Sequence, residues 1–177
     1  MARHVKSPQR GMTLRELCRL AVEMGAADAK VISPRNVVVR NWVRLKCQYG
    51  CGGYGKSLTC PPYTPTPDQM REVLNGYSQA VLVRFAPPEM DSHKIMVKLE
   101  REVFLSGHYS AFALAAGPCE MCAECNLSNC AHPREARPSM ESCGIDVYAT
   151  AHKAGMLLQV VRKRDETPRY YGLLLVK

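Results

Sequence analysis

Residues 79–116 read QAVLVRFAPPEMDSHKIMVKLEREVFLSGHYSAFALAA, and this stretch decides how the chain is expected to fold. The apolar run at 79–85 has the composition of a buried strand. Apolar residues recur at helical spacing over 91–106, and Gly107 marks the end of that helix. A run of small and apolar residues at 109–116 is typical of a second strand. Together these segments predict a β-α-β unit with parallel strands and a right-handed crossover.

Helix and strand signals continue on both sides of this unit. At Thr13 and Thr66 a threonine is followed three residues later by Glu or Gln, and such capping boxes predict helix starts. The other expected elements are strands at 29–33 and 37–46, a helical turn at 137–143, a helix at 146–154, and a hairpin of strands 156–161 and 170–176. We therefore expect residues 1–177 to form one α+β domain, α/β-like in its central unit, in which a mixed β-sheet is flanked by helices.

Four cysteines follow the β-α-β unit directly, in the segment GPCEMCAECNLSNCAHP at residues 117–133. Two residues separate Cys119 from Cys122 and Cys122 from Cys125, and four residues separate Cys125 from Cys130. This spacing resembles the C-x2-C-x2-C run of bacterial ferredoxins, which supplies three corners of an iron-sulfur cubane. Zinc sites more often use two separate CxxC hairpins. The run therefore favours a [4Fe-4S] cluster and leaves zinc as the alternative.

A second, looser group of cysteines precedes the unit and is separated by glycines, which let backbone N–H groups turn toward sulfur. Its last member, Cys60, is followed by two prolines. In bacterial ferredoxins a proline likewise follows the cysteine that binds the neighbouring cluster. Two partitions of the cysteines stay open, because the fourth ligands can be exchanged between centres. The local partition, which closes the shortest loops, assigns Cys119, Cys122, Cys125 and Cys130 to one centre and Cys47, Cys51, Cys60 and Cys143 to the other; a crossed partition exchanges Cys60, Cys130 or Cys143.

The overall charge is compatible with more than one partner. Lys and Arg outnumber Asp and Glu by 24 to 16, which gives a formal charge of +8. Two four-thiolate metal centres would lower this to about +4, which fits an acidic redox partner protein as well as nucleic acid. The five histidines have no motif partners and are expected at the surface or beside a metal site. No secretory signal or membrane span is recognisable, so the clustered thiols predict a metal protein of the reducing cytoplasm.

Other residues of the chain indicate a core position for the ninth cysteine and two alternative functions. Cys18 is expected to pack in the core of the first helix. A zinc-stabilised nucleic-acid-binding module would use Arg40, Trp42 and Arg44 on the outer face of strand 37–46, together with the basic run 162–164. An enzyme whose cluster has an open, substrate-binding iron would use other groups. Its candidate contacts are Tyr54, Tyr63 and Arg137.

The two cysteine groups resemble a known family. The matching stretches are CQYGCGGYG with CPP, GPC-x2-C-x2-C with the following cysteine, and ARPSMESCGID. They resemble the uncharacterised, predicted metal-binding proteins of domain of unknown function 2284, found mainly in anaerobic bacteria and archaea. The resemblance implies a metal site in a lobe formed by about 47–64 and 117–145, and by habitat an iron-sulfur site. It also supports Cys143 as a ligand, with Arg137 and Ser139 as hydrogen-bond donors to cluster sulfur or to an anionic ligand.

The function that these observations favour is electron transfer. No Walker loop, no GxGxxG after a strand and no radical adenosylmethionine motif is present. We therefore expect an iron-sulfur protein, with two [4Fe-4S] clusters, that serves an anaerobic redox system as an accessory protein rather than as a stand-alone catalyst.

Overall fold

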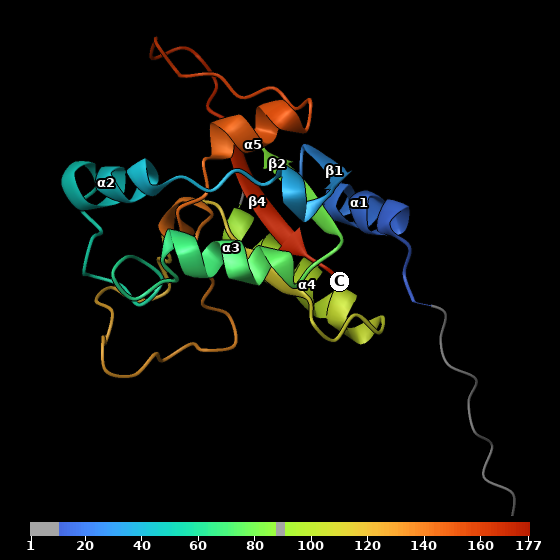
Figure 1. The fold of residues 1–177 in the computed structure, drawn as a ribbon, viewed down its shortest axis with the longest axis horizontal. Coiled ribbons are helices and arrows are strands. Elements are labelled where there is room, and N and C mark those ends of the chain that lie inside the picture. The colour runs from blue at the N-terminus through green and yellow to red at the C-terminus, as the bar shows by residue number, and fades with distance from the viewer. Residues whose placement is uncertain (1–10, 88–90) are drawn as a thin grey trace, which may run out of the picture.

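A four-stranded sheet forms the centre of the computed structural model, which describes residues 11–87 and 91–177 (Figure 1). The strands are ordered β1-β2-β4-β3, and each pairs with its neighbours in antiparallel fashion. β2 and β3 therefore run in the same direction, as predicted, but β4 lies between them. The α+β class is confirmed, but the predicted mixed sheet is antiparallel throughout, because β4 is inserted between the two strands of the predicted unit. The strands are β1 (Asp28–Ile32), β2 (Ala80–Phe85), β3 (Phe112–Leu114) and β4 (Tyr170–Leu175).

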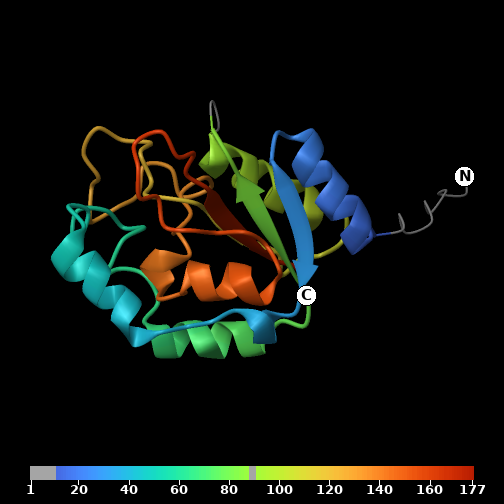
Figure 2. The ribbon, with the colours of Figure 1, turned by 90° about the horizontal axis from the view of Figure 1, so that it is seen from above.

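Helices cover both faces of this sheet (Figure 2). α1 and α4 lie on one face, and α3 and α5 lie on the other, while α2 extends to the side of the molecule. Two short 3-10 turns join these elements. The bounds are α1 (Leu14–Glu23), α2 (Asn41–Gly50), α3 (Pro67–Asn75), α4 (Ser92–Leu105), α5 (Val147–Lys153), η1 (Pro34–Asn36) and η2 (Glu141–Cys143).

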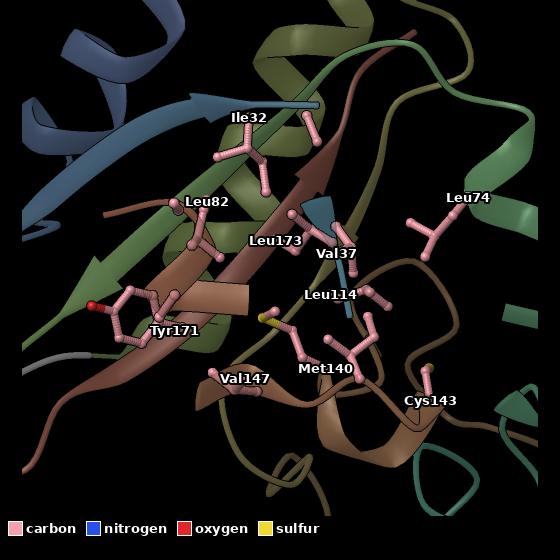
Figure 3. Packing of buried hydrophobic residues seen from close by; sticks show 14 of the residues in the cluster. Ile32, Val37, Leu74, Leu82, Leu114, Met140, Cys143, Val147, Tyr171 and Leu173 are labelled. Atoms are coloured by element: carbon pink, nitrogen blue, oxygen red, sulfur yellow. The ribbon is translucent and has the colours of Figure 1, made fainter. Parts of the chain in front are cut away.

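The core is divided by the sheet into two apolar clusters, because side chains alternate between the faces of a strand. In β2, Val81 and Val83 pack toward α1 and α4, whereas Leu82 packs toward α3 and α5. Leu173 and Leu174 of β4 divide in the same way. Figure 3 shows the cluster on the α5 side. The continuous apolar run of β2 is thus explained by burial on both faces of the sheet.

The predicted helix starts are confirmed by their caps. The side chains of Thr13 and Thr66 each accept a hydrogen bond from the backbone N–H of the third helical residue, and the side chain of that residue accepts one from the backbone N–H of the threonine. Asp91 caps α4 and Asp146 caps α5. These contacts satisfy N–H groups that a helix cannot satisfy itself, so a local sequence signal sufficed to find them.

The predicted strand 37–46 is wrong beyond its first residues. Residues 37–40 are extended, and Val39 forms an isolated bridge with Ile145, but α2 begins at Asn41. Arg40 precedes the helix without a side-chain cap, so no local signal marks its start. The inner face of α2 contacts η2, and this tertiary contact decides a segment whose intrinsic preference is weak.

The predicted hairpin of 156–161 with 170–176 is also wrong, although its second strand is confirmed as β4. β4 pairs with β2 along its whole length on one side, and β3 pairs with Leu173–Leu175 on the other side, so little of β4 is free to accept another strand. Residues 157–161 are without regular structure, and Val160 is exposed. Cys18 packs against the α1 side of the core, as predicted. Within the described ranges, no helix combines the length and the apolar character that crossing a membrane requires.

Candidate metal centre

Helix α2 brings Cys47 to the inner side of the metal-binding lobe. Residues three and four apart share one face of a helix, so Val43, Arg44 and Cys47 point the same way. Arg44 Nη1 donates to Thr64 Oγ1 at 3.0 Å, to the Pro65 carbonyl at 3.1 Å and to the Ser142 carbonyl at 2.7 Å. These bonds tie α2 to the two chain segments that follow the cysteine groups.

A compact loop brings Cys51 and Cys60 together. The Gly55 N–H donates to the Pro61 carbonyl at 2.8 Å and closes the loop. A methyl group built on Gly53 would lie 3.6 Å from Cys60 Sγ and 3.7 Å from Cys51 Sγ, so the two sulfur atoms are no more than about 7.3 Å apart. The Gly53 N–H also donates to Cys51 Sγ at 3.4 Å. The glycine therefore leaves space between two thiols and directs a backbone dipole toward one of them.

The thiols of this group influence one another's ionisation. Burial raises the pKa of Cys60, and the nearby charges of Cys51, Cys47 and Cys119 raise it further. Burial likewise raises the pKa of Cys47, with Cys51 as the next cause. Several thiolates this close together repel one another unless a cation lies among them. The structure thus places Cys119, the first residue of the ferredoxin-like run, close to the other cysteine group.

The ferredoxin-like run forms a site of its own. Cys119, Cys122, Cys125 and Cys130 all line one cavity of about 20 Å³, and Ser57–Thr59 of the other cysteine loop close it. The two cysteine loops therefore meet, and both lie at the end of the molecule where α2 extends (Figures 1 and 2). The spacing of the four cysteines predicted their convergence, whereas nothing in the sequence indicated that residues 57–59 contribute to this wall.

Backbone and side-chain contacts fix the far end of this cysteine loop. The His132 N–H donates to Cys130 Sγ at 3.4 Å, and His132 lines the same cavity. Arg137 Nε and Nη2 donate to the two carboxylate oxygens of Glu100 at 2.7 and 2.6 Å, and both side chains are largely buried. Arg137 is thereby held by α4, so its bidentate ion pair accounts for its burial without a contact to the metal site.

Cys143 lies in the protein core and not in either cysteine loop. It is completely buried at the edge of the apolar cluster, near Met140 and Leu114 (Figure 3). Burial raises its pKa to about 11. Metals bind the thiolate, which this environment disfavours. Cys47 is near enough to influence Cys143 electrostatically, so the predicted ligand role stays a prediction, while the geometry supports packing.

The fold gives several other predicted site residues surroundings that differ from those expected. Ser139 accepts a hydrogen bond from the Ser142 N–H at 3.1 Å, within the turn that leads into η2. The basic face predicted for strand 37–46 is rearranged in α2, because Arg44 turns inward whereas Arg40, Trp42 and Lys46 remain exposed. Tyr63 is exposed beside the cysteine loop.

The donor set fits a thiolate-bound metal group. All nine cysteines are free thiols, and seven of them belong to the two cysteine groups, six in the loops that meet and Cys47 on α2. Among the described residues, no three His, Cys, Asp or Glu side chains are already spaced to hold one ion directly. Six of those seven cysteines are not fully buried, so their side chains have room to turn toward a metal group.

An α+β fold with two converging thiol loops defines a cysteine-rich, metal-binding class of protein. The chain belongs to the family of predicted metal-binding proteins DUF2284, whose family model matches residues 30–176. The match includes both cysteine groups, and it confirms the resemblance that their spacing indicated. Comparison with curated proteins and with solved structures found no match.

Proposed function

We propose that this chain is an iron-sulfur protein that carries two [4Fe-4S] clusters and passes electrons to a larger redox enzyme. The observation that carries the proposal is the meeting of two thiol loops, one with ferredoxin-like spacing, across a shared wall. Cys119, Cys122, Cys125 and Cys130 would hold one cluster. Cys47, Cys51 and Cys60 would hold the other, with its fourth ligand drawn from Cys143 or, in a crossed arrangement, from the first group.

The contacts of the lobe explain what the protein itself contributes. Backbone N–H groups at Gly53 and His132 donate to ligand sulfur, and such bonds help to set the potential of a cluster. Cys119 lies close enough to Cys60 for their charges to interact, so the two centres would be neighbours. Neighbouring centres allow an electron to enter at one and leave at the other.

Helix α2 provides a docking surface beside these centres. Trp42, Leu45 and Tyr49 are 49, 56 and 78% exposed and form one stripe, opposite the face that carries Cys47. Residues 29–67 contain six Lys or Arg and no Asp or Glu. An apolar stripe within a basic surface is complementary to an acidic partner protein with an apolar centre. We assign this stripe to the redox partner.

Metal analysis tests the cluster proposal directly. Protein purified without oxygen should be brown and contain about eight iron and eight sulfide per chain, with an EPR signal after reduction. A colourless protein that binds zinc and no sulfide would refute it. That result would support the zinc-stabilised module, which the small volume of the four-cysteine cavity favours because an ion needs less space than a cubane.

Docking is tested with the intrinsic fluorescence of Trp42, the single tryptophan of the chain. Titration with an acidic ferredoxin should shift its emission to the blue, and added salt should weaken the effect. The variant Leu45→Ser/Tyr49→Ser should bind about tenfold or more weakly. The matched control Phe104→Ser/Leu105→Ser changes two equally exposed residues of α4 and should bind normally. Equal affinity of both variants would exclude α2 as the docking surface.

A further inference from the structure

Arg44 lies inside the metal-binding lobe and bonds only to uncharged groups. Its side chain is half-buried, and Nη1 donates to the Thr64 hydroxyl at 3.0 Å and to the carbonyls of Pro65 and Ser142 at 3.1 and 2.7 Å. No carboxylate of a described residue pairs with the guanidinium, and no described residue accepts a hydrogen bond from its Nε or Nη2. Arg44 therefore keeps an uncompensated positive charge and three unused N–H groups.

The bonds of Arg44 join three segments that carry cysteines. Cys47 lies one helical turn after Arg44 on the same face of α2. Two of the acceptors follow Cys60 by four and five residues, and the third directly precedes Cys143. The Thr64 hydroxyl, which accepts from Arg44, itself donates to the carbonyl that precedes Cys143. Loss of Arg44 would therefore loosen the contact between α2 and both other segments.

The charge of Arg44 also reaches the thiols, where it outweighs the charge of a nearby acid. Burial is the main cause that raises the pKa of Cys47 and of Cys143, and Arg44 lowers the pKa of both. The Glu141 carboxylate raises the pKa of both thiols, but by less than Arg44 lowers it. The combined effect of these two side chains on the thiols is therefore that of a cation.

A metal group bound by thiolates benefits from such a cation. Four thiolates around a zinc ion or an oxidised cubane leave a charge of about −2. A positive charge beside this group is favourable, and water screens it less in a half-buried site than at the surface. Arg137 supplies no such charge, because Glu100 neutralises it. Arg44 differs from Arg137 in this respect, since its acceptors are neutral oxygens.

We infer that Arg44 is the positioning and charge-compensating residue of the centre that contains Cys47, Cys51 and Cys60. Nη1 holds the three segments together, and the guanidinium charge stabilises the bound metal group. The inference rests on the centre assigned in the proposed function, but it applies to zinc as well as to a cluster, because both are negative with their thiolates. Arg44 donates to no residue of the ferredoxin-like run, so the centre of that run should keep its metal without Arg44.

Metal release from the full-length protein tests the inference. Native protein and Arg44→Met are titrated with 1,10-phenanthroline, which chelates both iron and zinc, and the thiols that become free are alkylated and identified by mass spectrometry. In Arg44→Met, the concentration that frees Cys47, Cys51 and Cys60 should fall about tenfold or more. The cysteines of the ferredoxin-like run should stay protected up to the native concentration.

A matched control removes the same charge outside the lobe. Arg101 is an exposed residue of α4, and it forms no hydrogen bond or ion pair with a described residue. Arg101→Met should therefore release its metal as the native protein does. Equal release by Arg44→Met and Arg101→Met would overturn the inference. Release from all seven cysteines at once in Arg44→Met would also overturn it, because that pattern shows general unfolding of the lobe.

Two further variants separate the charge from the positioning. Arg44→Lys keeps the charge but lacks the planar guanidinium, so it should recover most of the metal retention that Arg44→Met loses. Thr64→Val keeps the charge and removes the hydroxyl between Arg44 and η2, so it should lower the Tm with release close to native. Release by Arg44→Lys as early as by Arg44→Met would refute the charge role. Iron and sulfide are measured separately, so zinc in the native protein would refute the proposed clusters alone.

Discussion

Replacing Arg137 by methionine should destabilise the protein strongly, because it breaks the ion pair that connects the cysteine loop to α4. Arg137 and Glu100 are 13 and 14% exposed and share two hydrogen bonds. Glu100 also accepts the Ala113 N–H at 2.7 Å, and the Arg137 guanidinium lies 5.3 Å from the centre of the Phe112 ring. The substitution therefore leaves a largely buried carboxylate with one remaining neutral donor.

The size of the effect follows from this burial. Removing one partner of a buried ion pair costs about 3–5 kcal/mol, and the slight exposure of this pair favours about 3 kcal/mol. For a chain of this length, 1 kcal/mol corresponds to about 2–4 °C in Tm, so Arg137→Met should lower the Tm by about 6–12 °C. Replacing both partners, as in Glu100→Leu/Arg137→Met, should recover only part of this, because Ala113 loses its acceptor.

Circular dichroism melting without oxygen measures the change. The control Arg134→Met removes an exposed arginine of the same loop and should lower the Tm by no more than about 1–2 °C. Metal content is measured on the same samples, since the pair holds the end of the loop that contains Cys130. If Arg137→Met and Arg134→Met melted together, the ion pair would not support the metal-binding lobe and the argument would fail.

Three further predictions concern the thiols. Gly53→Ala places a methyl group in ordinary contact with Cys60 and Cys51 Sγ, at 3.6 and 3.7 Å, so the loop should still fold. The methyl group occupies space between the two thiols, and the bound iron should therefore fall, whereas Gly52→Ala, whose methyl group would meet nothing within 4 Å, should leave the iron content unchanged. Cys143 has a pKa raised to about 11 in the fold, from the model-peptide value of 9.0. The unfolded chain therefore loses this proton first, and the free energy of unfolding should fall by about 1.4 kcal/mol per pH unit between these values. Urea unfolding of Cys143→Ala should lack that loss and retain all its metal; loss of metal would instead show that the thiol is a ligand. Treatment with a strong chelator should lower the Tm of the native protein, because a group that binds only the folded state stabilises it; an unchanged Tm would contradict a metal-dependent lobe.

The sequence predicted those parts of the fold in which the contacting residues lie only a few positions apart in the chain. The capping boxes at Thr13 and Thr66 close within three residues, so the sequence predicted both helix starts. Residues 37–46 lacked such a signal. With a period of two, Val43, Leu45 and Cys47 would share one face; in α2, Val43 and Cys47 still share a face while Leu45 is exposed. Cys47 therefore shares a face with Val43 in a strand and in a helix alike.

The sequence by itself determined that the chain belongs to the family of predicted metal-binding proteins DUF2284 and that the four cysteines of the ferredoxin-like run line one cavity, because closely spaced residues can converge through local turns alone. Only the tertiary structure decided that β4 lies inside the sheet and that Cys143 is buried in apolar surroundings. It brings Ser57–Thr59, which precede Cys60, to the wall of the cavity that the ferredoxin-like run lines. These features depend on contacts between residues far apart in the chain, and their burial and spacing leave no periodic trace in the sequence.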